Sequence, residues 1–463
     1  MKKNRNMRAV IQAWLKRHLL QTAYIGGLSF LVNCHLDHAA PPEKPQRKPN
    51  IIVILSDDHG YSSVGCQGLS DIPTPNIDSI ARNGIRFTNG YVTCPICSPS
   101  RAGLLTGRYQ QRFGHEDNPG PIPVCSPNFG LPTDEKTMAD YLKEEGYATG
   151  MVGKWHLGHR PELHPQNRGF DEFFGFLHGA HSYLDPGLDS RDPIVRGNEK
   201  VDEKEYLTDA FAREAASFIE RHKNETFFLY LPFNAIHSPD EAPERLEGKF
   251  TEIEHPARRT WAKMLTALDE GVGRLLTKVR EEGLEDNTLI FFLGDNGGYP
   301  VGGIDSNIPL RGRKADTFEG GIRVPFMVQW KGRLDSGKVY ENPVISLDIL
   351  PTSLAAAGGD INPVVEGVNL LPYLKGENPG NPHDSLFWRL CKKSGARVGD
   401  WKLVDNGDGK EMLFNLADDI GEQNDLSISN PEKFKEMKSA YRDWDSKNIE
   451  PKWLDGRKTR KRR

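Results

Sequence analysis

Short runs of apolar, β-branched residues alternate along this chain with segments of helical periodicity. The clearest run is Asn50-Ile51-Ile52-Val53-Ile54-Leu55, which is typical of a strand buried on both faces of a sheet. Further strands are predicted at residues 87–92, 147–152, 226–232, 288–293, 325–330 and 344–350, and helices at residues 77–83, 137–145 and 260–282. This alternation predicts an α/β fold, in which helices sandwich a large, mostly parallel sheet.

The pattern changes after about Gly376, where short apolar segments are separated by turn-forming residues. Antiparallel strands are predicted at residues 385–390, 396–404 and 411–416, followed by a helix at residues 431–445. A chain of 463 residues suggests one large domain and a smaller one. We expect the large α/β domain at residues 50–375, a C-terminal α+β subdomain with an antiparallel sheet at residues 376–455, and a basic tail at residues 456–463.

The N-terminus has the pattern of an export signal. Basic residues within positions 1–17 precede an apolar run at about residues 19–32, which is too short and too polar for a membrane span. We assign residues 1–40 to this segment and residues 41–49 to an extended, proline-rich linker. Cleavage before Cys34 would give a lipid anchor, and cleavage near residues 39–40 is the alternative. The pattern predicts an exported protein, either periplasmic or on the outer surface. If cleavage occurs before Cys34, the protein is expected to be a lipoprotein.

The net charge does not favour nucleic-acid binding, and the cysteines do not favour a disulfide framework or a zinc site. The net charge of −4 gives no general attraction to nucleic acid, so no nucleic-acid partner is expected. The six cysteines form no recognisable disulfide framework for a chain of this length. Cys94-Pro95-Ile96-Cys97 is a CxxC pattern, but no second pair follows at the spacing of a zinc site.

Acidic and amide side chains directly follow two of the predicted buried strands. Asp57 and Asp58 follow the first strand, and Asp295 and Asn296 follow the strand at residues 288–293. Ligands collect at the carboxyl ends of strands in open α/β sheets. Three carboxylates and an amide oxygen suit a hard cation such as Ca²⁺ or Mg²⁺ better than zinc. Ordinary capping of turns and helices is the alternative for either pair alone.

Basic residues and histidines follow other predicted strands. Lys154 and His156 end the strand at residues 147–152 and lie two apart, so they point to the same side of an extended segment. One cation and one titratable ring can therefore meet one ligand there. The alternative is a surface lysine beside a histidine bonded to the backbone.

The stretch Cys97-Ser98-Pro99-Ser100-Arg101 carries the most specific pattern in the chain. A cysteine followed by Pro two positions later and Arg four positions later is the signal for oxidation of that cysteine to formylglycine. With its continuation to residue 108, the stretch resembles the type I, formylglycine-dependent sulfatases, the arylsulfatase-like members of the alkaline phosphatase superfamily. The resemblance spans about residues 49–375 and includes the blocks at residues 153–158, 233–239 and 310–326.

The resemblance implies an alkaline phosphatase-like fold, a sulfatase catalytic domain at residues 50–375 and the activity of a sulfuric ester hydrolase. A formylglycine-generating maturation enzyme would act on Cys97. The implied cofactor is one Ca²⁺, with Mg²⁺ as the alternative. The implied metal ligands are Asp57, Asp58, Cys97, Asp295 and Asn296, and the implied catalytic residues are Cys97, Arg101, Lys154, His156, His237 and Lys314.

The resemblance also implies a reaction sequence. One hydroxyl of the hydrated aldehyde attacks sulfur, with Asp295 as the family's candidate base. His237 protonates the leaving oxygen, with Lys314 as a candidate second donor. His156 then deprotonates the second hydroxyl, and the hemiacetal collapses with release of sulfate. Three carboxylates, a divalent cation and three basic side chains give the pocket a charge of +2, against −1 for a sulfate monoester. Such preorganised charge is often the largest catalytic contribution.

The substrate is predicted to be a sulfated carbohydrate. The polar loops at residues 114–120 and 177–183 are candidates for sugar binding, with plain structural loops as the alternative. The predicted substrate-binding residues are Lys154, His237, Lys314, His115, His178 and His181. Two other functions remain open: a phosphate or phosphonate monoester hydrolase of the same superfamily, and a catalytically silent binder of sulfated glycans if Cys97 stays unmodified.

Overall fold

The computed structural model describes residues 47–120, 128–188, 192–300 and 306–453. The predicted export segment with Cys34, most of the linker and the basic tail lie outside the described residues. The described residues from Lys48 onward group as one compact unit. Among the described helices, none combines the length and the apolar character that crossing a membrane requires.

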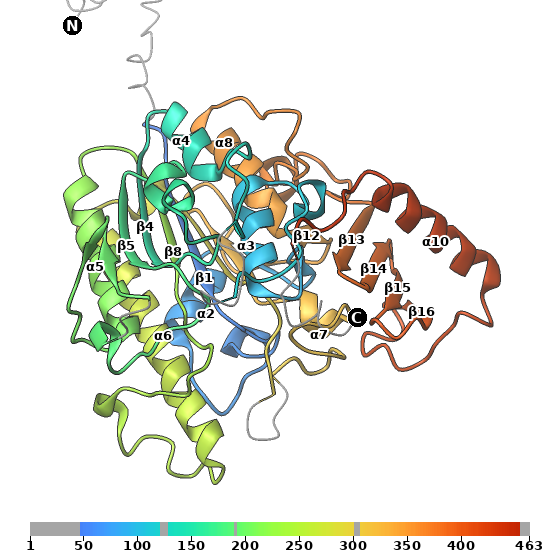
Figure 1. Ribbon diagram of the computed structural model, residues 1–463, viewed down its shortest axis with the longest axis horizontal. Coiled ribbons are helices and arrows are strands. Elements are labelled where there is room, and N and C mark those ends of the chain that lie inside the picture. The colour runs from blue at the N-terminus through green and yellow to red at the C-terminus, as the bar shows by residue number, and fades with distance from the viewer. Residues whose placement is uncertain (1–46, 121–127, 189–191, 301–305, 454–463) are drawn as a thin grey trace, which may run out of the picture. The chain divides into compact units, whose positions relative to one another are not determined.

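A ten-stranded sheet forms the centre of this unit (Figure 1). Its strands are, from edge to edge, β11 (Lys338–Tyr340), β2 (Ile85–Phe87), β10 (Phe326–Gln329), β9 (Thr288–Gly294), β1 (Asn50–Ser56), β8 (Phe227–Pro232), β4 (Ala148–Lys154), β5 (Glu172–Phe176), β6 (Val195–Arg196) and β7 (Glu199–Lys200). The central strands from β9 to β5 are parallel, whereas β10 runs antiparallel to β9. The predicted α/β fold with a mostly parallel sheet is therefore confirmed.

Helices cover both faces of this sheet, because successive residues of the central strands enter two different cores. In β1, Val53 lies in the core that includes α3, α4 and α8, whereas Ile52 and Ile54 lie in the core of α2, α5 and α6. The helices are α2 (Pro75–Arg82), α3 (Cys97–Thr106), α4 (Met138–Glu144), α5 (Leu207–His222), α6 (Pro256–Glu281), α7 (Glu319–Ile322), α8 (Ile349–Ala357) and α9 (Leu371–Leu374).

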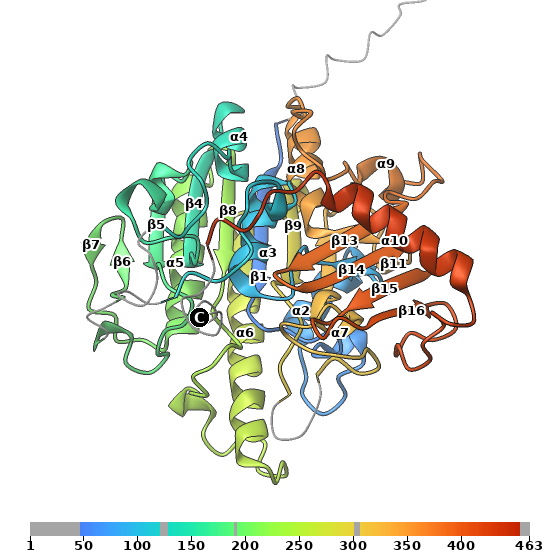
Figure 2. The ribbon, with the colours of Figure 1, turned by 45° about the vertical axis from the view of Figure 1, so that its right-hand side comes forward.

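A separate four-stranded antiparallel sheet follows, with one helix packed on it (Figure 2). Its elements are β13 (Ser385–Leu390), β14 (Lys393–Val398), β15 (Trp401–Asp405), β16 (Glu411–Asn415) and α10 (Pro431–Asp445). The predicted small antiparallel α+β unit is confirmed, but the single strand expected at residues 396–404 is wrong. Gly399 adopts a φ of 57° there, so the chain turns between β14 and β15.

The strand expected at residues 344–350 is also mostly wrong. Only β12 (Val344–Ile345) pairs, with β3 (Gly90–Tyr91), and the chain then enters α8. The run is apolar because α8 is buried on most sides, and a short apolar run does not distinguish a buried helix from a buried strand. The strand expected at residues 87–92 is likewise divided between β2 and β3.

A buried ionic network joins the small sheet to α7 and β3. Glu319, the first residue of α7, accepts hydrogen bonds from Lys402 Nζ and from the Tyr91 hydroxyl, each at 2.6 Å. The side chains of Glu319 and Lys402 are fully buried. Burial alone would raise the pKa of Glu319, but Lys402 and two nearby arginines lower this pKa to about 2. The carboxylate is therefore ionised, and β15 is tied to α7.

This network predicts that Lys402→Met destabilises the protein strongly. The substitution leaves the Glu319 carboxylate buried without its cation, which costs about 3–5 kcal/mol. Unfolding in urea measures the free energy directly. Lys435→Met, on the exposed side of α10, is the control and should change it by less than about 0.5 kcal/mol. Equal stability of both variants would contradict the role given to this ion pair.

Candidate active site

Several strand ends meet at one edge of the large sheet. Backbone hydrogen bonds hold them together: the Asp295 N–H donates to the Ser56 carbonyl, and the Asp57 N–H to the Ala235 carbonyl, each at 2.9 Å. The predicted site residues brought to this edge are Asp57 and Asp58 after β1, Asp295 and Asn296 after β9, Lys154 and His156 at the end of β4, and His237 after β8. The parallel sheet thus gathers residues from four distant parts of the chain.

Cys97 is the first residue of α3 and lies against this edge. Its Sγ lies 3.4 Å from Asp57 Oδ1 and 3.9 Å from Asp58 Oδ1. One ligand atom each from Asp57, Asp58, Cys97 and His237 lies within 4.8 Å of the others. Burial, and then the neighbouring Asp57 carboxylate, raises the pKa of the Cys97 thiol. An unmodified Cys97 is therefore a protonated, poor nucleophile at neutral pH.

Three basic side chains balance the three carboxylates. The pairs are Lys154 with Asp57 (Nζ to Oδ2, 2.5 Å), Lys314 with Asp58 (Nζ to Oδ2, 2.8 Å), and Arg101 with Asp295 (Nε and Nη2 to Oδ2, 3.0 and 2.8 Å). Burial alone would raise the pKa of Asp58, but the nearby Lys314 lowers it. As the pairs stand, three negative and three positive charges cancel.

Asp295 has a different environment from the other two carboxylates. Both of its oxygens are engaged, because Oδ2 accepts from Arg101 and Oδ1 accepts from the Asp58 N–H at 3.1 Å. Burial, and then the nearby Asp57, raises its pKa. Asp295 thus orients Arg101 through Oδ2, and Oδ1, which accepts a single hydrogen bond, is the oxygen that keeps a lone pair for a proton.

The corner formed by Asp57, Asp58 and Asn296 fits a hard cation. Asn296 Nδ2 donates to Asp58 Oδ1 at 2.8 Å, but the buried Asn296 Oδ1 has no hydrogen-bond partner among the described residues. An unpartnered buried amide oxygen is costly, and it is a ligand that Ca²⁺ and Mg²⁺ accept. His237, predicted as a catalytic and substrate-binding residue, also lies at this corner, with its Nε2 3.7 Å from Asp58 Oδ2.

Ser98, which the sequence did not single out, links two buried histidines. Its Oγ donates to the His156 carbonyl at 2.6 Å and, having one proton, accepts from His115 Nε2 at 2.7 Å. Burial lowers the pKa of His115 to about 3, so its ring is neutral. Burial and then Lys154 also hold the pKa of His156 well below its usual range.

The three histidines predicted to bind sugar occupy different environments. His115 is completely buried and, instead of facing a sugar, its ring contacts Ser98 and the Trp453 ring at 5.2 Å. His181 is also buried, and its two ring nitrogens lie within 2.9 Å of the carbonyls of Ser182 and Asp192. His178 is partly exposed and stacks on His159, with 3.8 Å between ring centroids. Among the three, His178 alone keeps a surface open to a ligand.

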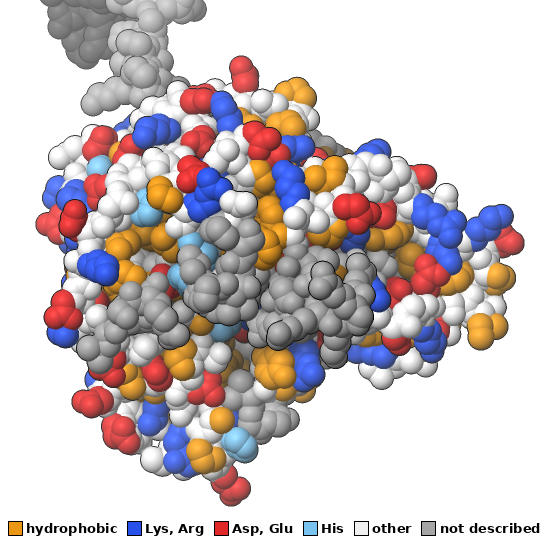
Figure 3. All heavy atoms as spheres, viewed as in Figure 1, with side chains coloured by type: hydrophobic (Ala, Val, Ile, Leu, Met, Phe, Trp, Pro, Cys, Tyr) orange, Lys and Arg blue, Asp and Glu red, His pale blue; other side chains and the backbone are white. Residues whose placement is uncertain are grey.

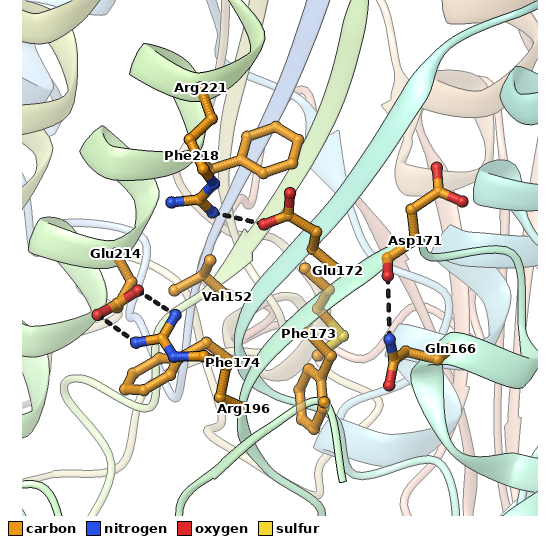
Figure 4. Close-up of a pocket in the computed structure, with 12 residues that line it drawn as sticks. Val152, Gln166, Asp171, Glu172, Phe173, Phe174, Arg196, Glu214, Phe218 and Arg221 are labelled. Atoms are coloured by element: carbon orange, nitrogen blue, oxygen red, sulfur yellow. Dashed lines mark hydrogen bonds and ion pairs between the residues drawn. The ribbon is translucent and has the colours of Figure 1, made fainter. Parts of the chain in front are cut away.

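A separate cavity of about 340 Å³ lies beside α5 and β5 (Figure 4). Two arginines project into it, but each is already paired with a glutamate. Arg196 makes two hydrogen bonds of 2.7 Å to Glu214, and Arg221 pairs with Glu172. The residues that line this cavity include none of the predicted site residues. It is therefore a cavity separate from the cluster around Cys97, and both of its arginines are already paired.

Comparison with known proteins places the chain in a family. The sequence profile of the family described as Sulfatase matches residues 49–359. Arylsulfatase J of Mus musculus is 35% identical over 78% of this chain and 65% of its own length. N-acetylgalactosamine-6-sulfatase of Homo sapiens is 35% identical over 70% of this chain and 66% of its own length. The chain spans slightly less than two thirds of both relatives. It belongs to the sulfatase family of the alkaline phosphatase superfamily, a family of sulfuric ester hydrolases.

Solved structures share the fold over most of the chain. The crystal structure of Ps i-CgsB in complex with k-i-k-neocarrahexaose is 37% identical, with a TM-score of 0.84, and covers 89% of this chain and 96% of that one. The phosphonate monoester hydrolase SpPMH from Silicibacter pomeroyi has a TM-score of 0.68 at 18% identity over 88% of this chain and 96% of that one, and shares the fold alone. The fold alone therefore does not separate sulfate from phosphonate chemistry.

The position of Gly179 generates a prediction for His156. A Cβ atom at Gly179 would lie 2.6 Å from His156 Nε2, closer than any side chain can approach. Gly179→Ala should therefore displace the buried ring and lower kcat roughly a hundredfold, because small misplacements of catalytic groups have effects of that size. Steady-state sulfate release measures this, with Gly380→Ala in an exposed loop as the control. Wild-type kcat in a folded Gly179→Ala variant would refute the packing argument.

Proposed function

We propose that this protein removes sulfate from a sulfated carbohydrate, using formylglycine made from Cys97 and one bound Ca²⁺. The observation that carries the proposal is the position of the Cys97 side chain, 3.4 Å from Asp57 and inside a cluster of balanced charges. Hydrated formylglycine supplies two hydroxyls on one carbon at that position, in place of a thiol that its surroundings keep protonated. A formylglycine-generating enzyme of the producing cell is the partner that this requires.

Asp57, Asp58 and Asn296 are the residues that we propose to hold the cation, with Mg²⁺ as the alternative. A divalent cation there lowers the pKa of a bound hydroxyl and attracts the oxygens of the sulfate. It also adds two positive charges to a neutral cluster, which leaves Lys154 and Lys314 available to a sulfate ester of charge −1. These ammonium groups are already in place and need no reorganisation when negative charge develops on the sulfuryl oxygens.

Two histidines are proposed to move protons on opposite sides of the cluster. His237 is partly exposed, and its Nδ1 lies 2.6 Å from the Ser238 carbonyl, so Nε2 is the atom that can protonate the leaving alcohol. His156 is buried, and its lowered pKa keeps it neutral and able to accept a proton. Arg101, held by Asp295, is proposed to fix the nucleophile beside them.

A sulfated oligosaccharide or polysaccharide is the proposed substrate, with galactose- or N-acetylgalactosamine-type sugars. The similarity to Ps i-CgsB, solved with k-i-k-neocarrahexaose, supports this class. On the described part of the face in Figure 3, acidic and basic side chains are interspersed, which does not favour a nucleic-acid partner. The N-terminal pattern of the sequence supports export to the periplasm or outer surface, with Cys34 as the candidate lipid anchor.

The decisive experiment examines Cys97 itself. The peptide that contains Cys97, isolated from the native cell, should be about 18 Da lighter than the thiol form, the mass difference between a thiol and an aldehyde. The purified protein should release sulfate from sulfated glycans, and Cys97→Ala should abolish this release. An unmodified thiol together with glycan binding would instead indicate a silent binder. Preferential release of phosphate would indicate the phosphoesterase alternative.

Removal of the cation should weaken both activity and stability. A chelator should lower Tm, because a ligand that binds only the folded state stabilises it, and should stop sulfate release. Added Ca²⁺ should restore both. Asn296→Ala removes the proposed amide ligand, so its Tm should respond much less to chelator and to Ca²⁺. A wild-type Tm and activity that are unchanged by exhaustive chelation would overturn the metal proposal.

A further inference from the structure

The catalytic cluster, meaning the charged residues and histidines gathered around Cys97, is exposed mainly on one side. The side chains of Asp57, Lys154 and Arg101 have 0% exposed surface. Those of Lys314 and His237 keep 18% and 17%. A sulfate ester must therefore place its sulfate toward the buried residues and its alcohol part toward Lys314 and His237. Side chains next to these two are the first that the rest of the substrate can meet.

Tyr299 and Arg313 flank Lys314 on this side. Arg313 precedes Lys314 in the chain, and Tyr299 follows Gly298, whose carbonyl accepts the Lys314 N–H at 3.2 Å. The guanidinium carbon of Arg313 lies 4.8 Å from the centre of the Tyr299 ring, and Tyr299 is 53% exposed. The two chain segments that meet at Lys314 thus also present an exposed aromatic ring and an exposed cation.

The Arg313 guanidinium makes no ion pair or hydrogen bond with a described residue, and the hydrogen bond of this residue to Asp316 comes from its backbone N–H. The nearby Arg311 differs, because its guanidinium donates to the Glu422 carbonyl at 2.6 Å. A guanidinium that rests on an aromatic ring is partly oriented, while its N–H groups remain available to a ligand. Its planar set of donors matches the paired oxygens of a sulfate or a carboxylate.

We propose that Arg313 and Tyr299 form a subsite for a second anionic group on the substrate, carried by a sugar next to the one that loses its sulfate. Arg313 binds the sulfate or carboxylate oxygens of that group, and the Tyr299 ring packs against the sugar. The proposal rests on the proposed sulfatase function. It narrows the substrate class to glycans that carry at least two anionic groups, of which the catalytic cluster binds one.

The test compares Arg313→Gln with the wild type on four substrates. They are a small aryl sulfate with a single anionic group, an oligosaccharide with one sulfate, and two oligosaccharides of the same length with either a second sulfate or a carboxylate. Arg313→Gln should raise KM for the doubly anionic substrates roughly ten- to a hundredfold, the range of a charged hydrogen bond, and leave kcat unchanged. KM for the two singly anionic substrates should stay at the wild-type value. The doubly anionic substrate whose KM rises more shows whether Arg313 binds a sulfate or a carboxylate.

Matched variants separate this subsite from a general charge effect. Arg280→Gln removes an exposed arginine on α6, bonded only to Thr277, and should behave like the wild type. Arg313→Lys keeps the charge without the planar set of donors and should lose part of the preference. Equal KM values of Arg313→Gln and Arg280→Gln for all four substrates would overturn the subsite while leaving the sulfatase proposal intact.

The subsite remains testable if the sulfatase proposal fails. If the wild type releases sulfate from none of the substrates, calorimetric binding of the doubly sulfated oligosaccharide to Cys97→Ala replaces the kinetic measurement. Adding Arg313→Gln to that variant should weaken binding roughly ten- to a hundredfold. Unchanged or undetectable binding in this comparison would count against the subsite.

Discussion

The balance of buried charge at the carboxyl edge of the large sheet is the constraint on which this structure depends. Three carboxylates and three basic side chains lie there with little or no access to water, and each of them would be costly if left alone. Their pairing requires the neighbouring strands β9, β1, β8 and β4 to end at the same edge and Lys314 to reach Asp58 from another loop. A parallel sheet satisfies this requirement because its strand ends converge on one edge.

The small C-terminal sheet also helps to position these paired charges, although none of them lies on it. Lys314 and Glu319 lie on one loop, and Glu319 is fixed by Lys402 on β15. Backbone bonds continue the connection, because the Gly297 N–H donates to the Gly321 carbonyl at 3.0 Å beside the Asp295 loop. The ion pair between β15 and α7 therefore positions a loop of the catalytic cluster. The small sheet is part of the support of the site.

Sequence patterns predicted those parts of the structure that depend on local composition. β1 and β9 were predicted because strands buried on both faces are continuously apolar. The strand expected at residues 344–350 failed for the same reason, since buried α8 is equally apolar. Motif resemblance predicted the residues around Cys97, but Ser98 and Gly179 act through contacts with His156, which is distant in the chain. Loop polarity suggested a sugar contact for His115 because composition does not reveal that a loop is buried.

The environment of Cys97 differs from that of a cysteine nucleophile. Catalytic thiols lie where cations stabilise the thiolate, whereas burial and the Asp57 carboxylate outweigh Lys154 and Lys314 and raise the pKa of the Cys97 thiol. The Cys97 Sγ lies 3.4 Å from Asp57 Oδ1 and 3.9 Å from Asp58 Oδ1. These carboxylates disfavour a negative sulfur, yet with the unpartnered oxygen of Asn296 they are suitable ligands for a hard cation. A cation at that corner would reverse the local field and favour a negative oxygen at position 97. The carboxylates that suppress the thiol therefore support an oxygen nucleophile made from the same residue.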